Sequence, residues 1–197
     1  VEAAFARARP EVVVNLAAQA GVRYSIENPR AYVESNVTGF FNILEACRHS
    51  AALCGGAVRH LVYASSSSVY APTAEQMSES ARLAPLSPYG VSKLAGECLV
   101  GAYAHERGLS TVSLRFFSVY GPRQRPDMAI HRFTEALLDG REVTLFGDSI
   151  QLRDFTYVGD VARAVVSALT APLPSGTILN VAMGSPVAVP EVLRLIE

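Results

Sequence analysis

Short apolar runs alternate with long segments of helical periodicity, and this alternation constrains the fold more than any other feature of the sequence. Buried strands are predicted at Val12–Leu16, Leu61–Ala64 and Thr111–Phe116. Long helices are predicted between them, over about Pro29–Arg48 and Pro88–Arg107. Strands that alternate with helices indicate an α/β protein with a mostly parallel sheet.

The alternation becomes looser in the C-terminal part of the chain. Further elements are predicted as helices at Met128–Leu138 and Val158–Leu169 and as strands at Val143–Phe146 and Ile178–Val181. We place the boundary between the two regions near Val119–Pro122, and we interpret Ser50–Val58 and Ser118–Asp127 as loops. The chain starts without Met inside one helical pattern and ends inside another, so we expect an internal segment of a longer protein.

Charge and cysteine content argue against several classes of protein. The chain has 17 Lys and Arg residues against 18 Asp and Glu residues, which gives no electrostatic reason to expect nucleic-acid or membrane-surface binding. No apolar run approaches the roughly 18 residues needed to span a bilayer. Cys47, Cys54 and Cys98 fit neither a disulfide framework nor a zinc motif. We therefore expect a cytoplasmic protein with reduced thiols and with no metal, nucleic-acid or membrane partner.

The strongest chemical signal is the pentad Tyr89-Gly-Val-Ser-Lys93 in a predicted helix. Side chains four residues apart lie on one helix face, so the phenol and the ammonium can share a hydrogen-bonding site. A phenol has a pKa of about 10, too high for a general base at neutral pH, and a neighbouring ammonium lowers it. On the pentad alone, a half-buried tyrosine beside a solvated lysine remains the alternative.

A run of serines, Ser65–Ser68, directly follows the predicted strand Leu61–Ala64. A hydroxyl at this place can donate to a substrate oxygen that becomes a carbonyl during oxidation, and a turn satisfied by its own backbone is the alternative. Ligands of open α/β sheets bind beyond the carboxyl ends of the strands. Strand-end serines followed by SPYxxxK at the start of the next helix therefore favour a catalytic Ser/Tyr/Lys site.

The chain resembles the extended short-chain dehydrogenase/reductases, in particular the NAD-dependent nucleotide-sugar epimerase/dehydratase family. The likeness rests on motifs in the family's order: NLAAQAGVR (15–23), SNVTG (35–39), ASSSSVY (64–70), SPYGVSK (87–93), LRFFSVYGP (114–122), RPDMA (125–129) and RDFTY (153–157). It implies that residues 1–119 form part of an NAD-binding, Rossmann-like domain with the catalytic residues. Residues 120–197 would form part of a smaller α/β region that binds the nucleotide sugar.

The resemblance also implies roles for individual residues. It makes Ser66 the catalytic serine, Tyr89 the base and Lys93 its partner. Contacts with NAD are expected from Leu16, Ala17, Ala18, Gln19, Ser35, Tyr89, Lys93 and Phe116. Contacts with the UDP-sugar are expected from Ser67, Ser68, Ser118, Arg125, Phe146 and Arg153.

Some of these assignments have alternatives. Arg153 matches the arginine that grips the nucleotide diphosphate, a contact suited to a guanidinium. Phe146 is a candidate for the uracil contact or an ordinary core residue. Arg125 is a counter-charge for the sugar carboxylate or phosphates, or a solvated loop residue. Asn36, next to Ser35, could equally serve helix packing.

The residues after Ser66 bear on the reaction. Ser67 and Ser68 stand where dehydratases of the family carry an Asp-Glu pair, which disfavours dehydration. Similarity is greatest to UDP-glucuronate 4-epimerases, which implies conversion of UDP-glucuronate to UDP-galacturonate through a 4-keto intermediate. The alternatives are a UDP-glucose or UDP-N-acetylhexosamine 4-epimerase and a UDP-glucuronate decarboxylase. A non-catalytic dinucleotide-sensing or partner-binding relative would usually lack Tyr89 or Lys93.

One part of the family pattern is missing. No glycine-rich phosphate loop is present, so we expect this chain alone to bind NAD poorly and to be inactive. The resemblance further implies a homodimer through the two long predicted helices.

Overall fold

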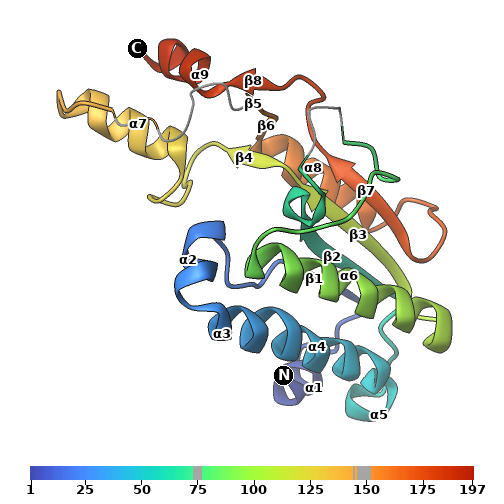
Figure 1. Cartoon of the computed structure of the whole chain (residues 1–197). Helices are drawn as coiled ribbons and strands as arrows, with labels where there is room; N and C mark the ends of the chain where they lie inside the picture. Colours follow the sequence, from blue (N-terminus) through green and yellow to red (C-terminus); the bar gives the residue numbers. More distant parts are fainter. Residues whose placement is uncertain (73–76, 144, 146–151) are drawn as a thin grey trace. The chain divides into compact units, whose positions relative to one another are not determined.

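Residues 1–72, 77–143, 145 and 152–197 are described by the structure, a computed structural model (Figure 1). The chain forms two compact units. The first unit consists of Val1–Phe116 with Val165–Asn180, and the second consists of Phe117–Ala164 with Val181–Glu197. The helix α8 (Val158–Ala168) has residues in both units.

In the described part of the first unit, four strands form a sheet in the order β1-β2-β3-β7. They are β1 (Val12–Asn15), β2 (His60–Ser66), β3 (Ser110–Phe116) and β7 (Thr177–Val181). β1 and β2 pair in parallel, as do β2 and β3, and the register places Ser66 opposite Phe116. The predicted α/β fold with a parallel sheet is confirmed, and two residues of the expected site lie at the same sheet edge.

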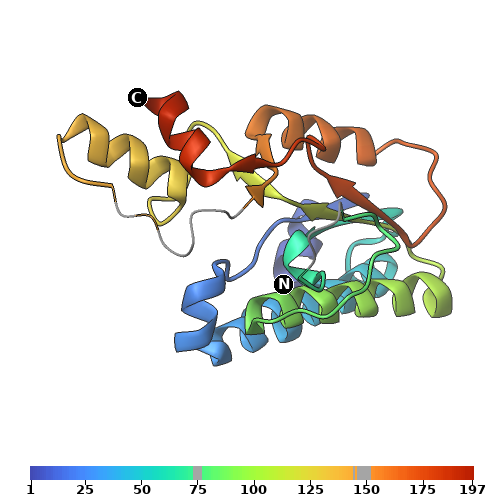
Figure 2. The same cartoon turned by 45° about the horizontal axis from the view of Figure 1, so that its top comes forward.

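Two long helices, α4 (Gly39–Arg48) and α6 (Pro88–Arg107), lie side by side on one face of this sheet (Figures 1 and 2). The core that they share with the sheet includes the buried side chains of Phe40, Leu44, Leu61, Tyr63 and Val100. Burial of these apolar side chains is the main force that holds the helices on the strands.

The ends of α6 follow the local signals in the sequence. Ser87 is the N-cap, with its Oγ accepting a hydrogen bond from Gly90 N at 3.1 Å, and Pro88 occupies the first helical position. Gly108 ends the helix with a φ of 66°, a conformation in which glycine is favoured. The prediction for this helix is therefore confirmed at both ends.

The predicted helix at 29–48 is continuous but not uniform. It consists of α3 (Pro29–Tyr32), a turn of π-helix at Val33–Thr38, and α4. The π-helical turn changes the period at Asn36, whose side chain is buried. Purely α-helical periodicity cannot predict which residues such a turn directs inward.

Other parts of the first unit differ from the sequence prediction. The predicted loop Ser50–Val58 contains the helix α5 (Ser50–Cys54), which ends at Gly55 with a φ of 74°. The small residues in this segment led to the prediction of a loop, but the segment forms a helix that packs against α1 (Glu2–Ala8). The short helix α2 (Val22–Glu27) was also not predicted.

The second unit has short strands and amphipathic helices. Its elements are β4 (Ser118–Tyr120), α7 (Ala129–Leu138), β5 (Leu152–Arg153), β6 (Phe155–Tyr157), β8 (Val187–Ala188) and α9 (Val189–Ile196). β4 pairs with β6 in parallel, and β5 pairs with β8 in antiparallel fashion. The predicted loop Ser118–Asp127 is therefore wrong at its start, which is a strand. In the predicted strand Val143–Phe146, residues 144 and 146 lie outside the described residues, and Val143 and Leu145 are not in a strand.

Within the described residues, no helix is long and apolar enough to cross a membrane.

Candidate functional site

The helix α6 presents Tyr89, Lys93 and Glu97 at intervals of four residues, so the three side chains share one face. Tyr89 is half-buried and packs edge-on against Tyr32, with the ring centroids 6.1 Å apart. The phenol is therefore held in the first unit by an aromatic contact from the neighbouring helix α3.

Lys93 is buried, and its Nζ donates a hydrogen bond to the Ala64 carbonyl oxygen of β2 at 2.8 Å. The ammonium also lies 5.3 Å from the centre of the Tyr63 ring. Burial lowers the pKa of Lys93 to about 8. The side chain thus holds its cationic head under the end of β2, beside the serine turn.

Lys93 is also unusual in the composition of the chain. It is the only lysine in the sequence, among 17 Lys and Arg residues in total. An arginine could not replace it here, because a guanidinium is larger, planar and not titratable in this way. This is a sequence signal for a special role that motif matching alone passes over.

The serine turn begins where β2 ends. Ser66 is buried, and its Oγ accepts a hydrogen bond from Ser68 N at 3.2 Å, while Ser67 and Ser68 are half-buried. The alternative predicted from the sequence, a serine turn that is satisfied by its own backbone, therefore holds in part, because the Ser66 Oγ accepts a hydrogen bond from the backbone of the turn. The Ser66 proton can still be donated to another oxygen, because a hydroxyl both donates and accepts.

Gly90 brings the start of α6 against this serine turn. A Cβ at this position would overlap the Ser68 carbonyl oxygen, and it would lie 2.8 Å from the Pro85 Cβ. Only glycine permits so close an approach of the two segments. Tyr89, immediately before Gly90, is therefore held close to the turn that contains Ser66.

The loop after β1 is fastened to the same region by Asn36. The Asn36 Oδ1 accepts from Gln19 N at 2.7 Å, and its Nδ2 donates to Gln19 O and to the Ser92 Oγ, both at 2.9 Å. The Tyr32 hydroxyl donates to the carbonyl oxygen of Gly21 at 2.6 Å. Asn36 therefore does more than fill space between helices, because it joins the loop to α6 next to Lys93.

The other expected cofactor residues of the first unit surround this loop. Leu16, Ala17 and Ser35 are exposed, whereas Ala18, Gln19 and Phe116 are half-buried. All of them belong to the region where the strands β1, β2 and β3 end, or to the helix beside it. Ligands of open α/β sheets bind at this edge.

A buried ion pair below the site was missed by the sequence reasoning. Arg115 Nε lies 2.9 Å from Glu97 Oε1, and Arg115 Nη2 lies 2.7 Å from Glu97 Oε2. The signal was present, because Arg115 is a charged residue within a strand predicted to be buried and therefore needs a partner. Glu97 continues the helix face of Tyr89 and Lys93.

The second unit carries three of the expected substrate residues. Ser118 is half-buried, and its backbone N–H donates to Asp154 O at 3.0 Å. Arg153 is exposed, and its Nη1 donates to Leu152 O at 3.0 Å. Arg125 is exposed and forms an ion pair with Asp127 at 2.5 Å. Phe146 lies outside the described residues.

Asp154 organises this unit and was not singled out from the sequence. Its carboxylate is buried and accepts backbone N–H groups from Met183 at 2.8 Å, Gly184 at 2.7 Å and Ser185 at 3.2 Å. A carboxylate satisfied by consecutive N–H groups fixes the loop that carries them. Asp154 thereby also fixes the position of its neighbour, Arg153.

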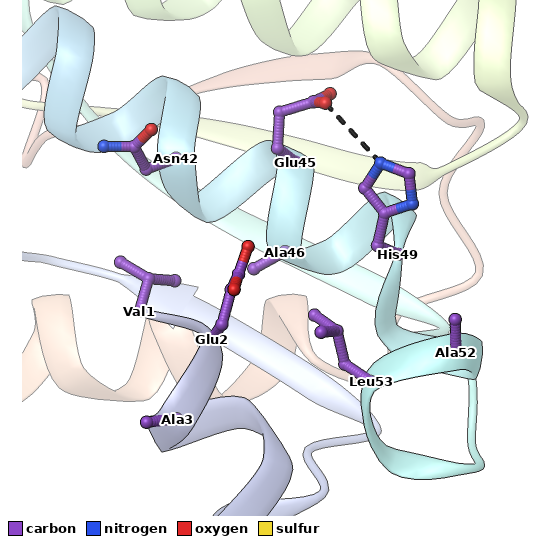
Figure 3. Close-up of a pocket in the computed structure, with 9 residues that line it drawn as sticks. All are labelled: Val1, Glu2, Ala3, Asn42, Glu45, Ala46, His49, Ala52 and Leu53. Atoms are coloured by element: carbon purple, nitrogen blue, oxygen red, sulfur yellow. Dashed lines mark ion pairs between the residues drawn. The ribbon is translucent and has the colours of Figure 1, made fainter.

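The structure also contains a hollow of about 650 Å³ among α1, α4 and α5 (Figure 3). Figure 3 shows Glu45 and His49 on one wall, with 3.7 Å between Glu45 Oε2 and His49 Nε2. Of the expected catalytic, cofactor and substrate residues that the structure describes, none lines it.

A Tyr/Lys helix face, a strand-end serine turn and a parallel sheet together define an α/β protein of the dinucleotide-dependent class. Residues 1–182 match the NAD dependent epimerase/dehydratase family, and the chain belongs to it. The resemblance inferred from the motifs is thus confirmed.

Several relatives of known name are similar to the chain. It is 48% identical over 170 residues to Protein CapI of Staphylococcus aureus, which covers 85% of this chain and 49% of that protein. The UDP-glucuronic acid 4-epimerase of Bacillus cereus, solved with UDP-glucuronic acid and NAD, is 39% identical with a TM-score of 0.88, covering 95% of this chain and 58% of that one. The UDP-glucose 4-epimerase of Thermus thermophilus, solved with NAD, is 39% identical with a TM-score of 0.89, covering 99% and 63%. The chain spans about half the length of the curated relatives it matches.

Proposed function

We propose that the whole protein is an NAD-dependent UDP-sugar 4-epimerase that interconverts UDP-glucuronate and UDP-galacturonate. The observation that carries this proposal is the joint placement of Tyr89, Lys93 and the Ser66 turn, held together by the close approach at Gly90 and by the hydrogen bond from Lys93 to Ala64 O. A base, a cation and a hydroxyl donor at one sheet edge are what oxidation and reduction of a sugar carbon require.

Each residue has a part in the reaction. Tyr89 Oη removes the proton of the sugar C4 hydroxyl, and the Lys93 ammonium favours the phenolate form of Tyr89. The Ser66 hydroxyl donates a hydrogen bond to the C4 oxygen as it becomes a carbonyl. Bound NAD would supply the hydride acceptor and donor that C4 needs, so that the hydride can return to the opposite face of the sugar. Tyr89 then returns its proton, so no net oxidation occurs.

The residues present fit such a cofactor. The loop after β1 leaves Leu16 exposed at the sheet edge, and the only lysine of the chain, Lys93, lies buried against Ala64 of the neighbouring strand β2. We assign NAD contacts to Lys93, Tyr89, Ser35, Phe116 and the loop residues Leu16, Ala17, Ala18 and Gln19. Lys93 has three N–H donors, so it can hold a ribose hydroxyl while keeping its bond to Ala64 O.

A glucuronate substrate makes an additional demand. Its 4-keto form is a β-keto acid, which loses CO2 when the C5–C6 bond aligns with the carbonyl π system. We propose that hydroxyl groups of Ser67, Ser68 and Ser118 hold the carboxylate away from this alignment. Ser67→Ala and Ser118→Ala should then release more decarboxylated pentose product per turnover. An unchanged ratio of epimer to pentose in both variants would contradict this role.

The remaining substrate assignments follow the charge of the nucleotide. Arg153 is exposed and is assigned to the diphosphate, which a guanidinium can hold in bidentate fashion. Arg125 is assigned to the sugar carboxylate or phosphates, in competition with its ion pair to Asp127. Phe146 is assigned to the uracil. Residues 1–119 are then the NAD-binding part of the protein and residues 120–197 the nucleotide-sugar part.

A second substrate has its own support. The similarity to the Thermus UDP-glucose 4-epimerase equals that to the Bacillus enzyme in identity, so UDP-glucose and its N-acetylated relatives are the alternative substrates. UDP-glucuronate decarboxylation is a third outcome. A non-catalytic role is disfavoured because Tyr89 and Lys93 are both present and placed on the same helix face.

We further propose a cytoplasmic homodimer that uses α4 and α6.

The test uses the whole protein with NAD and UDP-glucuronate, and NMR of the sugar products. UDP-galacturonate without pentose supports the proposal, and a Tyr89→Phe variant should lower turnover by roughly 10²–10⁴-fold. Pentose as the main product would reassign the protein as a decarboxylase. Turnover of UDP-glucose alone would establish the alternative substrate and remove the argument about the carboxylate.

A further inference from the structure

The buried pair of Glu97 and Arg115 is bonded to both ends of the serine turn. Before the turn, the Ser65 Oγ donates a hydrogen bond to Glu97 Oε1. After it, Arg115 Nη1 donates to the Tyr70 Oη at 2.8 Å, and the guanidinium lies 4.7 Å from the centre of the Tyr70 ring. Ser66, between these two attachments, therefore belongs to a segment that is tied at each end to one ion pair.

The same pair fixes the helix that carries Tyr89 and Lys93. Glu97 lies one helical turn beyond Lys93, and Arg115 lies on β3 opposite Ser65 of β2. The contact therefore sets how closely α6 lies against the two strands. Lys93 is bonded to Ala64 O, one residue before Ser65, so the helix and the strand are joined at successive turns.

Stability alone is a weak explanation for this arrangement. The side chains of Arg115 and Glu97 are 1% and 3% exposed, and taking two charges out of water is costly. Well-packed apolar residues often serve as well in such a place. Burial acts to lower the Arg115 pKa, but the hydrogen bonds to Glu97 and Tyr70 outweigh it and the pKa is raised. The guanidinium thus stays charged and keeps its directional bonds.

We propose that Glu97 and Arg115 are positioning residues, which act through Ser65 and Tyr70 to hold the Ser66 turn at a fixed distance from Tyr89 and Lys93. This inference rests on the proposed function for its role in turnover. Neither residue touches the substrate in this scheme. Their bonds select one spacing between the serine hydroxyl, the phenol and the ammonium.

The expected effect is on turnover rather than on substrate binding. Misplacement of reacting groups by about 1 Å can cost roughly 10²-fold in rate. The nucleotide is assigned to other residues, so KM should change little. In the proposed mechanism the Lys93 ammonium favours the phenolate form of Tyr89, so a looser contact between α6 and β2 should weaken this influence and move the Tyr89 titration to higher pH.

The experiment uses hydroxyl deletions in the whole protein, because removal of a buried charge could prevent folding. Ser65→Ala removes the bond to Glu97. Tyr70→Phe keeps the ring and removes the bond from Arg115, together with the hydrogen bond that the Tyr70 Oη donates to Asn180 Oδ1 at 2.6 Å. Ser50→Ala is the matched control, since the buried Ser50 Oγ makes two hydrogen bonds, at 2.7 Å to Cys47 O and at 2.8 Å from Val58 N.

Three readouts are compared: thermal stability, kcat and KM for UDP-glucuronate, and the titration of Tyr89. The titration is followed in the NAD-free protein as the ultraviolet difference between each protein and the same protein carrying Tyr89→Phe. We expect kcat to fall by about 10- to 100-fold in Ser65→Ala and Tyr70→Phe with KM within about twofold, and the Tyr89 titration to move to higher pH. Ser50→Ala should lower thermal stability without either change.

The proposal is overturned if Ser65→Ala and Tyr70→Phe lose stability like Ser50→Ala while kcat and the Tyr89 titration stay at their wild-type values. A change in either readout beyond the control supports it. If the wild-type protein turns over no UDP-sugar, the proposed function fails, and the Tyr89 titration alone then decides whether the ion pair is a positioning device.

Discussion

Replacing Lys93 by methionine should change how the stability of the protein depends on pH. Lys93→Met keeps a side chain of similar length and removes the titratable ammonium. The NAD-free whole protein is the appropriate sample, because a bound cofactor would add its own contribution to stability. The quantity of interest is the difference in unfolding free energy between wild type and variant, followed across the alkaline range.

The size of the effect follows from the burial of Lys93. The ammonium has a pKa of about 8 in the folded chain, against an ordinary value of 10.5. Between these two values the unfolded state binds more protons than the folded state, so this group makes the protein more stable as pH rises. At about 1.4 kcal/mol for each pH unit, the full effect is about 3 kcal/mol. It is complete above the unfolded pKa and is lost as pH falls through the folded pKa.

The assay is urea unfolding of both proteins at a series of pH values. From about pH 7 to about pH 10, the stability of the wild type relative to Lys93→Met should rise by about 2–3 kcal/mol. Groups that Lys93 does not influence titrate equally in the two proteins and cancel in the difference. The lost hydrogen bond to Ala64 O lowers the stability of the variant at every pH, and so does not affect the slope.

Parallel curves for the two proteins would refute the reasoning. They would mean that Lys93 titrates alike in the folded and unfolded states, and hence that its ammonium is solvated rather than buried against β2. The assignment of Lys93 as the cation that acts on Tyr89 would then lose its structural basis.

Two further changes test the packing of each unit by urea unfolding. Gly96→Ala should destabilise the protein by about 1–3 kcal/mol, because the new Cβ would overlap the buried Tyr63 hydroxyl. Gly101→Ala on the same helix is the control, since its Cβ meets open space and should stabilise by about 0.5–1 kcal/mol. Equal effects of the two changes would contradict the close contact at Gly96. Asp154→Asn should lower the unfolding free energy by about 2 kcal/mol, because it removes the negative charge that accepts hydrogen bonds from the backbone N–H groups of residues 183–185. An unchanged urea midpoint would show that the loop at residues 183–185 does not depend on this carboxylate.

Local signals account for what the sequence predicted correctly. The helix α6 was placed because Ser87 and Gly108 mark its ends, and β1, β2 and β3 because short apolar runs stand out from their surroundings. Ser66, Tyr89 and Lys93 were singled out by their spacing and by the resemblance to a family, and their catalytic role stays a prediction. None of these inferences needs knowledge of a contact between distant segments.

What the sequence could not show depends on such contacts. The partner of Arg115 is Glu97, 18 positions away, and the pairing becomes visible only when α6 lies on β3. The carboxylate of Asp154 finds its N–H donors about 30 residues further on. The helix α5 lacks a strong periodic pattern and depends on its packing partner. Sequence periodicity predicts which face of a helix or strand is buried, but it does not predict which residues of other segments pack against that face.

The amide of Asn36 makes a mechanical joint out of two segments that are far apart in the chain. It forms hydrogen bonds with the backbone of Gln19 on one side and with the Ser92 Oγ on the other, and Ser92 directly precedes Lys93 in α6. An outward movement of the loop at Gln19 must either break these hydrogen bonds or pull on α6. A molecule that binds to the loop can therefore change the position of Lys93 through Asn36. The Asn36 side chain need not contact the cofactor or the sugar for this to happen.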